Sequence, residues 1–138
     1  MHTERNVGLS GGFLPGPADV SVTLAGIPAA ISAVRTIVAD IMTGSPRADD
    51  AVLIACEYAT NAIRHSPSGL PGGEFTLRVW ARRGWVRIEL TDLGEEDWVP
   101  APVSLDEETG RGLIVVEALS DIWGHFGGRV WAEIAWPE

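Results

Sequence analysis

Apolar residues alternate with polar ones in several short segments, and this two-residue period predicts strands. The alternation runs from Val20 to Leu24, and it returns over residues 75–81 and 85–91. A short polar turn that contains Gly84 joins the second and third of these segments. Two strands joined in this way predict a β-hairpin.

Elsewhere the apolar residues recur every three or four positions, which predicts helices. The first helix is expected over residues 29–42 and the second over residues 48–65. A stretch rich in Gly, Ser and Pro follows each of them and ends it. A third helix is expected to start after Gly112 and to continue to about Ser120.

The remaining segments define the limits of the domain. Two further strands are predicted over residues 122–126 and 129–136, separated by a glycine turn. Residues 1–17 show no periodicity and are interpreted as a flexible tail, so a single domain spans residues 18–138. Residues 95–109 are acidic, contain two prolines and are expected to form a loop. The predicted fold class is α+β, a two-layer α/β sandwich with a mixed, mostly antiparallel sheet and about three helices on one face.

Composition narrows the classes of function. The chain has 138 residues and a formal net charge of −9, and all ten of its cationic residues are arginines. Such an acidic surface repels nucleic acid, so direct nucleic-acid binding is not expected. No apolar run approaches the roughly 18–20 residues that span a bilayer, and the first residues lack the pattern of a secretory signal. With Cys56 as the single cysteine, nothing points to an oxidising compartment, and a cytoplasmic protein without membrane contact is expected.

The second predicted helix carries a polar stripe. At about 100° per residue, Asn61 lies about 40° from Glu57, and Arg64 lies about 20° to its other side. A carboxylate can accept a proton, an amide oxygen can bind a hard cation and a guanidinium can pair with phosphate. The alternative is an ordinary solvent-exposed stripe with surface ion pairs. The opposite side is apolar and is expected to face the core through Val52, Cys56, Ala59 and Ile63.

A second polar element follows the third predicted strand. Asp92 leaves this apolar strand, and Gly94 comes two residues later. The carboxylate can accept a hydrogen bond from an exocyclic amine such as that of adenine, and the glycine lets the backbone approach a flat ring. The alternative is an ordinary turn that ends a strand.

A third element, Gly110-Arg111-Gly112-Leu113, precedes the third predicted helix. Two glycines at a helix start allow the first backbone N–H groups to face an anion, which the helix dipole also favours. The alternative is a flexible loop with a glycine-rich entry into the helix. This spacing matches neither the dinucleotide-binding nor the Walker fingerprint.

Taken in order, the chain has E-x-x-x-N on a helix, D-x-G after a strand and G-x-G-L at a helix start. This order resembles the N, G1 and G2 boxes of the histidine-kinase-like (GHKL) ATPases. It is most similar to the small anti-sigma-factor serine/threonine kinases and their actinobacterial relatives. The C-terminal part, from Gly110 through Trp123 to Glu133, is similar to the same branch. The resemblance covers roughly residues 18–138 and implies the ATP-binding Bergerat fold.

The resemblance implies a role for each matching residue. Glu57 matches the catalytic carboxylate, Asn61 the ligand of Mg²⁺, and Asp92 the aspartate that reads adenine. The glycine-rich element matches the turn that faces the phosphates of ATP. With Arg64 as a phosphate partner, the expected nucleotide-binding residues are Asn61, Arg64, Asp92, Gly94, Gly110, Arg111, Gly112 and Leu113. One departure is Glu96, which replaces the second glycine of the fuller D-x-G-x-G pattern.

Two main functions remain open at this point. The resemblance implies an anti-sigma-type serine/threonine kinase that holds a sigma factor, phosphorylates an antagonist protein of the STAS type and so controls transcription. The alternative is a non-catalytic or weakly catalytic ATP-binding switch that acts through protein contacts. A third reading is the detached catalytic domain of a two-component histidine kinase. The resemblance also leaves a homodimer open, because dimers are common in that branch.

Overall fold

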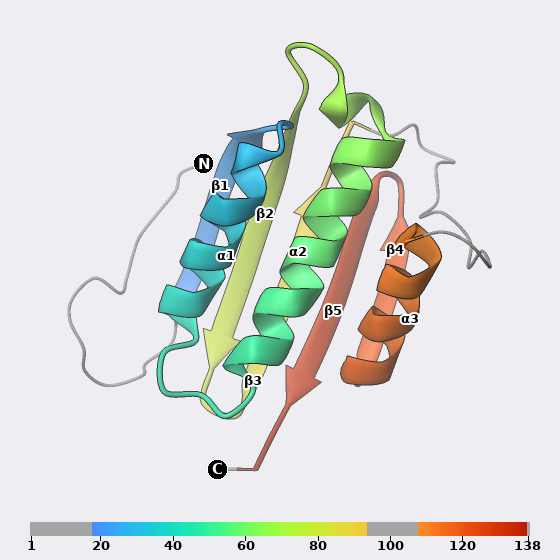
Figure 1. Ribbon diagram of the computed structural model, residues 1–138. Coiled ribbons are helices and arrows are strands. Elements are labelled where there is room, and N and C mark those ends of the chain that lie inside the picture. The colour runs from blue at the N-terminus through green and yellow to red at the C-terminus, as the bar shows by residue number, and fades with distance from the viewer. Residues whose placement is uncertain (1–17, 94–107, 138) are drawn as a thin grey trace.

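A single sheet covered on one face by helices makes up the protein (Figure 1). The computed structural model describes residues 18–93 and 108–137. The expected tail over residues 1–17 and most of the expected acidic loop lie outside these ranges. Among the described residues, no helix is long and apolar enough to cross a membrane.

The sheet has five strands in the order β1-β2-β3-β5-β4, and every neighbouring pair is antiparallel. The predicted two-layer α+β sandwich is confirmed, with a sheet that is antiparallel throughout. The strands are β1 (Ala18–Ala25), β2 (Glu74–Arg82), β3 (Trp85–Thr91), β4 (Ile122–Phe126) and β5 (Arg129–Ala135). The helices are α1 (Ala29–Ile41), α2 (Ala48–His65) and α3 (Glu108–Leu119), with a short 3-10 turn, η1 (Pro67–Gly69), after α2.

The predicted start of the third helix was wrong. Helix α3 begins at Glu108 and not after Gly112, so five additional residues, two of them glycines, are helical. The prediction placed these glycines before the helix. A glycine costs a helix only about 1 kcal/mol relative to alanine, which contacts elsewhere in the fold can outweigh.

The core lies between the helices and the sheet, because every second strand residue points toward the helices. In β2 these residues include Leu77 and Val79, and in β3 they include Val86, Ile88 and Leu90, all of them buried. Small residues on α2 let this helix pack closely on the sheet. The buried apolar side chains of α2 are Ala51, Ile54, Ala55, Cys56, Tyr58, Ala59 and Ala62.

One buried polar contact joins α2 to the sheet. The hydroxyl of Tyr58 donates a hydrogen bond to the backbone oxygen of Trp131 over 2.8 Å. Burial raises the pKa of the Tyr58 hydroxyl well above its usual value of 10. The phenol therefore stays protonated, and hence a donor, throughout the neutral range.

Replacing Tyr58 by Phe removes this donor and keeps the ring. We expect Tyr58→Phe to lower the free energy of unfolding by about 1–2 kcal/mol, because the buried acceptor loses its partner. Urea denaturation with an unchanged m-value measures the loss. An unchanged midpoint would show that the hydrogen bond adds nothing to stability.

Glycines allow η1 to lie directly against one end of the sheet. The N–H of Gly26 donates to the oxygen of Gly73 over 2.9 Å, which joins the segments at the ends of β1 and β2. A Cβ at Gly26 would lie 1.8 Å from the backbone oxygen of Ser68, and a Cβ at Gly73 would lie 2.2 Å from it. No side chain fits at either position. The backbone of η1 therefore packs on two glycines.

Candidate functional site

Three elements converge at one end of the sandwich. In Figure 1, α2 ends, β3 ends and α3 begins toward the upper end of the view. Ser68 joins two of these elements, because its buried hydroxyl accepts a hydrogen bond from the N–H of Leu93 over 2.9 Å. Ser68 belongs to η1, directly after α2, whereas Leu93 follows β3. The C-terminal ends of α2 and β3 are therefore held together.

Asn61 is the most unusual polar residue at this end. It lies in the last turns of α2 and is only 7% exposed. Among the described residues, its Oδ1 is a buried side-chain atom without a hydrogen-bond partner. Leaving a buried acceptor unpaired costs about 1–3 kcal/mol, so such atoms in native proteins call for an explanation. An amide oxygen in this condition is suited to a hard cation or to a donor from a ligand.

The other two residues of the polar stripe are less buried. Glu57, one turn before Asn61, is partly buried, and Arg64, near the end of α2, is exposed. Both residues already have an interaction partner. The stripe thus extends from a buried amide to an exposed guanidinium. An ordinary solvent-exposed stripe, the alternative interpretation of the sequence, therefore fits the exposed Arg64 but not the buried Asn61.

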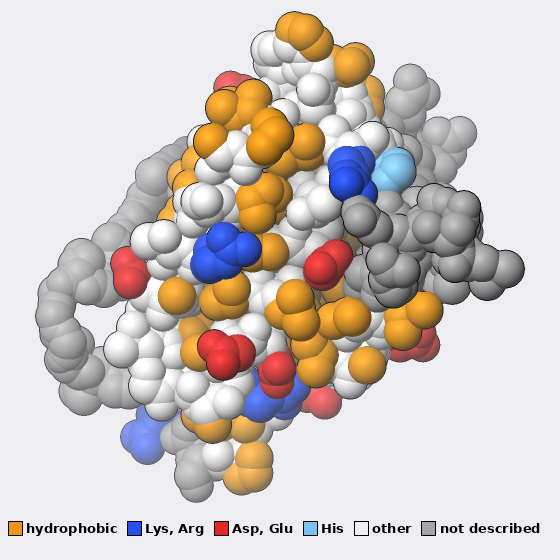
Figure 2. All heavy atoms as spheres, viewed as in Figure 1, with side chains coloured by type: hydrophobic (Ala, Val, Ile, Leu, Met, Phe, Trp, Pro, Cys, Tyr) orange, Lys and Arg blue, Asp and Glu red, His pale blue; other side chains and the backbone are white. Residues whose placement is uncertain are grey.

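All four residues of the predicted core face of α2 belong to the core or pack against it. Cys56 and Ala59 are buried, and Val52 and Ile63 are partly buried. Burial raises the pKa of the Cys56 thiol, as expected for a small core residue, with Glu57 adding to the effect and Arg35 opposing it. The buried face is rotated toward Asn61 because α2 is covered by the sheet and by neighbouring helices. Figure 2 shows the outer side of the helices, where apolar side chains lie between charged ones of both signs.

Asp92 lies directly after β3 and is 8% exposed. Its N–H donates to the oxygen of Gly128 over 2.9 Å, which fixes the backbone against the turn between β4 and β5. The side chain of Asp92 also has a contact with another residue. A buried carboxylate at a strand end offers an acceptor to an amine group of a ligand. Gly94, the expected companion of Asp92, lies outside the described residues.

The glycine-rich element is helical. Gly110 and Arg111 lie in the first turn of α3, and Gly112 and Leu113 lie in the next. In a helix that begins at Glu108, the first four N–H groups have no acceptor within the helix. Among the described residues these include the N–H groups of residues 108–110, whereas those of Arg111, Gly112 and Leu113 bond within the helix. A backbone site for an anion would therefore lie at the start of α3, where the helix dipole favours negative charge.

Sequence reasoning missed the roles of Ser68 and Tyr58. Ser68 was interpreted only as part of the stretch that ends α2. The signal for its role was the group of glycines that follows it in the sequence, of which Gly73 lies against its backbone oxygen. Close approach of two backbones requires glycines in this way.

Comparison with known protein families agrees with this geometry. The family model of the histidine kinase-like ATPase domain matches residues 20–125. The chain therefore belongs to the histidine kinase-like ATPase domain family. The match includes α2, the end of β3 and the start of α3, and it supports an ATP-binding regulatory domain. No curated protein matches the chain in sequence.

Proposed function

We propose that this domain is a serine/threonine kinase of the anti-sigma type. It binds ATP with Mg²⁺ and transfers the γ-phosphoryl group to a seryl or threonyl hydroxyl of an antagonist protein of the STAS type. It also holds a sigma factor, and in this way it controls transcription. The observation that carries the proposal is the buried Oδ1 of Asn61, which has no partner among the described residues and lies one helical turn from Glu57.

The residues present fit a magnesium ion. The Oδ1 of Asn61 is a hard oxygen that lacks a partner among the described residues. Mg²⁺ is usually held by one or two protein oxygens together with phosphate oxygens and water. Bound there, the ion would neutralise charge on the transferred phosphoryl group. Asn61 would hold the ion, and the start of α3 together with Arg64 would bind the phosphates.

The remaining site residues have distinct tasks in this proposal. Asp92 accepts a hydrogen bond from the exocyclic amine of adenine and so selects the base. Glu57 orients the attacking hydroxyl and accepts its proton as the oxygen–phosphorus bond forms and ADP leaves. Both tasks suit the observed burial, because a partly or fully buried carboxylate is held in one orientation by its surroundings.

A second function, an ATP-binding switch with little or no turnover, is favoured by one feature of the sequence. Glu96 stands where the family's fuller pattern has glycine, and Glu95 and Asp97 flank it. Negative charges near a triphosphate weaken its binding. In this alternative, nucleotide binding changes the affinity for a protein partner, and a homodimer is one form that such a switch can take.

Nucleotide binding is tested by thermal unfolding with ATP and Mg²⁺. A ligand of the native state at 100 times its Kd stabilises it by about 2.7 kcal/mol, which raises the Tm by roughly 8–10 °C for a domain of this size. We expect this rise with ATP plus Mg²⁺ and a smaller one when Mg²⁺ is removed. An unchanged Tm at millimolar ATP would contradict both proposed functions.

The Asp92→Asn variant tests base recognition within the same assay. It replaces an acceptor oxygen by a donor that faces the adenine amine, so ATP should bind about 10–100-fold more weakly. Asp50→Asn is the matched control, because Asp50 pairs with Arg47 at the other end of α2. If both variants bind ATP like the parent protein, Asp92 does not read the base.

A further inference from the structure

The face of the sheet that points away from the helices contains a hollow of about 380 Å³. This volume is at the lower end of the range for small-ligand sites. It lies across the ends of β2, β3 and β5 and the turn after β4. The residues that line it are Thr76, Arg78, Glu89, Thr91, Phe126, Gly127 and Arg129. The polar stripe of α2 is on the other side of the sheet, so this hollow is separate from the nucleotide site.

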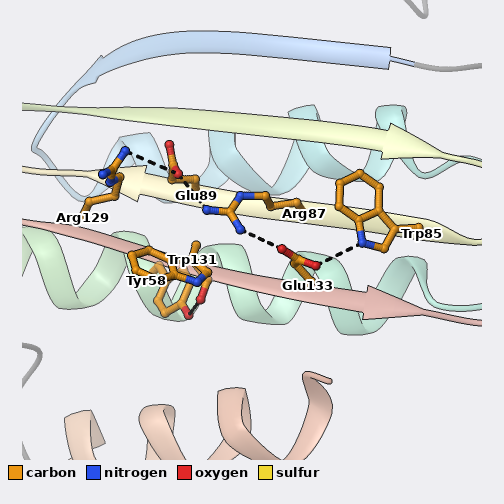
Figure 3. A network of polar contacts seen from close by, with 7 residues as sticks. All are labelled: Tyr58, Trp85, Arg87, Glu89, Arg129, Trp131 and Glu133. Atoms are coloured by element: carbon orange, nitrogen blue, oxygen red, sulfur yellow. Dashed lines mark hydrogen bonds and ion pairs between the residues drawn. The ribbon is translucent and has the colours of Figure 1, made fainter. Parts of the chain in front are cut away.

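A network of charged residues on the same sheet face shares Glu89 and Arg129 with the lining of the hollow (Figure 3). Arg87 bonds to Glu89 over 3.1 Å and to Glu133 over 2.7 Å. Its guanidinium also lies 5.8 Å from the ring centre of Trp80 and 5.4 Å from that of Trp131. Arg87 is therefore held by four neighbours. Its charge is shared between two carboxylates, one of which is Glu89.

Two other arginines line the hollow without strong partners. Arg129 is 46% exposed, and its Nη1 is 4.0 Å from the nearest carboxylate oxygen, on Glu89. Arg78 is exposed, and its guanidinium forms no hydrogen bond or ion pair with any residue in the described part of the chain. Arg78 lies directly opposite Glu89 in the register of β2 and β3. The lining thus has two cations and one anion, a local excess of one positive charge in a protein of net charge −9.

We propose that this hollow binds a monoanionic carboxylate attached to an apolar or aromatic group. The guanidinium groups of Arg78 and Arg129 provide donors that suit a carboxylate. The hydroxyls of Thr76 and Thr91 lie on the same face and can add further hydrogen bonds. The 66% exposed ring of Phe126 provides a flat apolar wall for the rest of the ligand.

The buried carboxylate of Glu89 selects the charge of the ligand. This side chain is only 5% exposed, so solvent screens it poorly. A single negative charge on the ligand balances the excess of positive charge in the lining. A dianion such as a phosphate monoester adds a second negative charge beside Glu89 and binds less well for that reason.

The carboxylate can come from a small molecule or from the C-terminus of a protein. Phenylacetate is a suitable probe for the first source. A short peptide that ends in a phenylalanine with a free carboxylate is suitable for the second. Phenylacetamide and the amidated peptide have the same shapes without the charge, and phenyl phosphate has two charges.

Nuclear magnetic resonance titrations of the ¹⁵N-labelled full chain measure binding. We expect phenylacetate to shift the amide signals of Thr91, Gly127 and Arg129 with a Kd on the order of 1 mM, a typical value for so small a ligand. Phenylacetamide should bind at least tenfold more weakly, and phenyl phosphate should not bind more tightly. A free-carboxylate peptide that binds at least tenfold more tightly than phenylacetate assigns the site to a protein C-terminus, whereas equal or weaker binding assigns it to a small molecule.

Two leucine variants connect the binding to the hollow. Arg78→Leu should weaken phenylacetate binding at least fivefold and should fold normally, because its exposed guanidinium has no partner to lose among the described residues. Arg82→Leu is the matched control, because Arg82 lies on the same face of β2 but pairs with Asp19 outside the hollow. Equal binding by Arg78→Leu and the parent protein, or equal binding of phenylacetate and its amide, would overturn the proposal.

Discussion

Glu57→Gln should reduce phosphoryl transfer by about 10²–10⁴-fold, the usual contribution of a general base. Glutamine has nearly the same shape as glutamate but cannot accept the proton of the attacking hydroxyl. The affinity for ATP should change little, since in the proposed mechanism the carboxylate faces the attacking group and not the phosphates. The measurement is transfer of label from radiolabelled ATP to antagonist proteins of the same genome.

Two further variants are needed to interpret the result for Glu57→Gln. Glu117→Gln is the matched control, because Glu117 is exposed on α3 and should leave transfer unchanged. Asn61→Ala should lose Mg²⁺-dependent affinity and transfer together, since it removes the proposed ligand of the ion. Full transfer by Glu57→Gln would exclude the catalytic role assigned to this residue. A parent protein that transfers no phosphate, but whose affinity for a sigma factor changes with nucleotide, would support the switch instead.

Gly26→Ala should cause a large loss of stability, about 3 kcal/mol or more. The added Cβ would lie 1.8 Å from the backbone oxygen of Ser68, and a backbone atom cannot move aside as a side-chain tip can. Movement of η1 would also disturb the hydrogen bond from Leu93 to Ser68, which holds the end of β3 beside the end of α2. We therefore expect Gly26→Ala to lower both the Tm, by roughly 10 °C, and the affinity for nucleotide.

Gly44→Ala separates this clash from backbone strain. Gly44 has a φ of +87°, and a Cβ there would have no neighbour within 4 Å. The control should therefore cost only about 1 kcal/mol, the usual penalty for a side chain in the left-handed region. Gly26 has no positive φ, so its substitution reports the clash alone. Equal losses from the two variants in thermal and urea unfolding would show that the packing of η1 on Gly26 is unimportant.

Local signals explain why most elements could be predicted from the sequence. The bounds of α2, β3 and β4 agree with the prediction because glycine, serine and proline interrupt the apolar pattern at their ends. The start of α3 could not be predicted in this way, because glycines there lie inside the helix. Their cost is offset by contacts with the rest of the fold, and such contacts leave no local pattern.

For the candidate site too, the local pattern could be predicted from the sequence and the long-range contacts could not. Helical spacing placed Glu57 and Asn61 on one stripe, but it could not show that Asn61 is buried and that its Oδ1 has no partner in the described part of the chain. Burial depends on which elements cover the helix, and these lie far away in the sequence. The contacts of Ser68 with Gly26 and Leu93, and the strand register that places Arg78 opposite Glu89, likewise depend on the folded arrangement.

Three tryptophans lie on the open face of the sheet, and their fluorescence reports on that face. Trp80 and Trp131 flank the guanidinium of Arg87, and the Nε1 of Trp85 donates to Glu133 over 3.3 Å. Half of the six indoles in the chain thus report on the side of the sheet that is turned away from α2. Indole emission depends on nearby charges, so the emission of these three tryptophans follows events beside Arg87 more directly than events beside Asn61. A ligand of the open sheet face should therefore change their emission, whereas nucleotide binding is better followed by calorimetry.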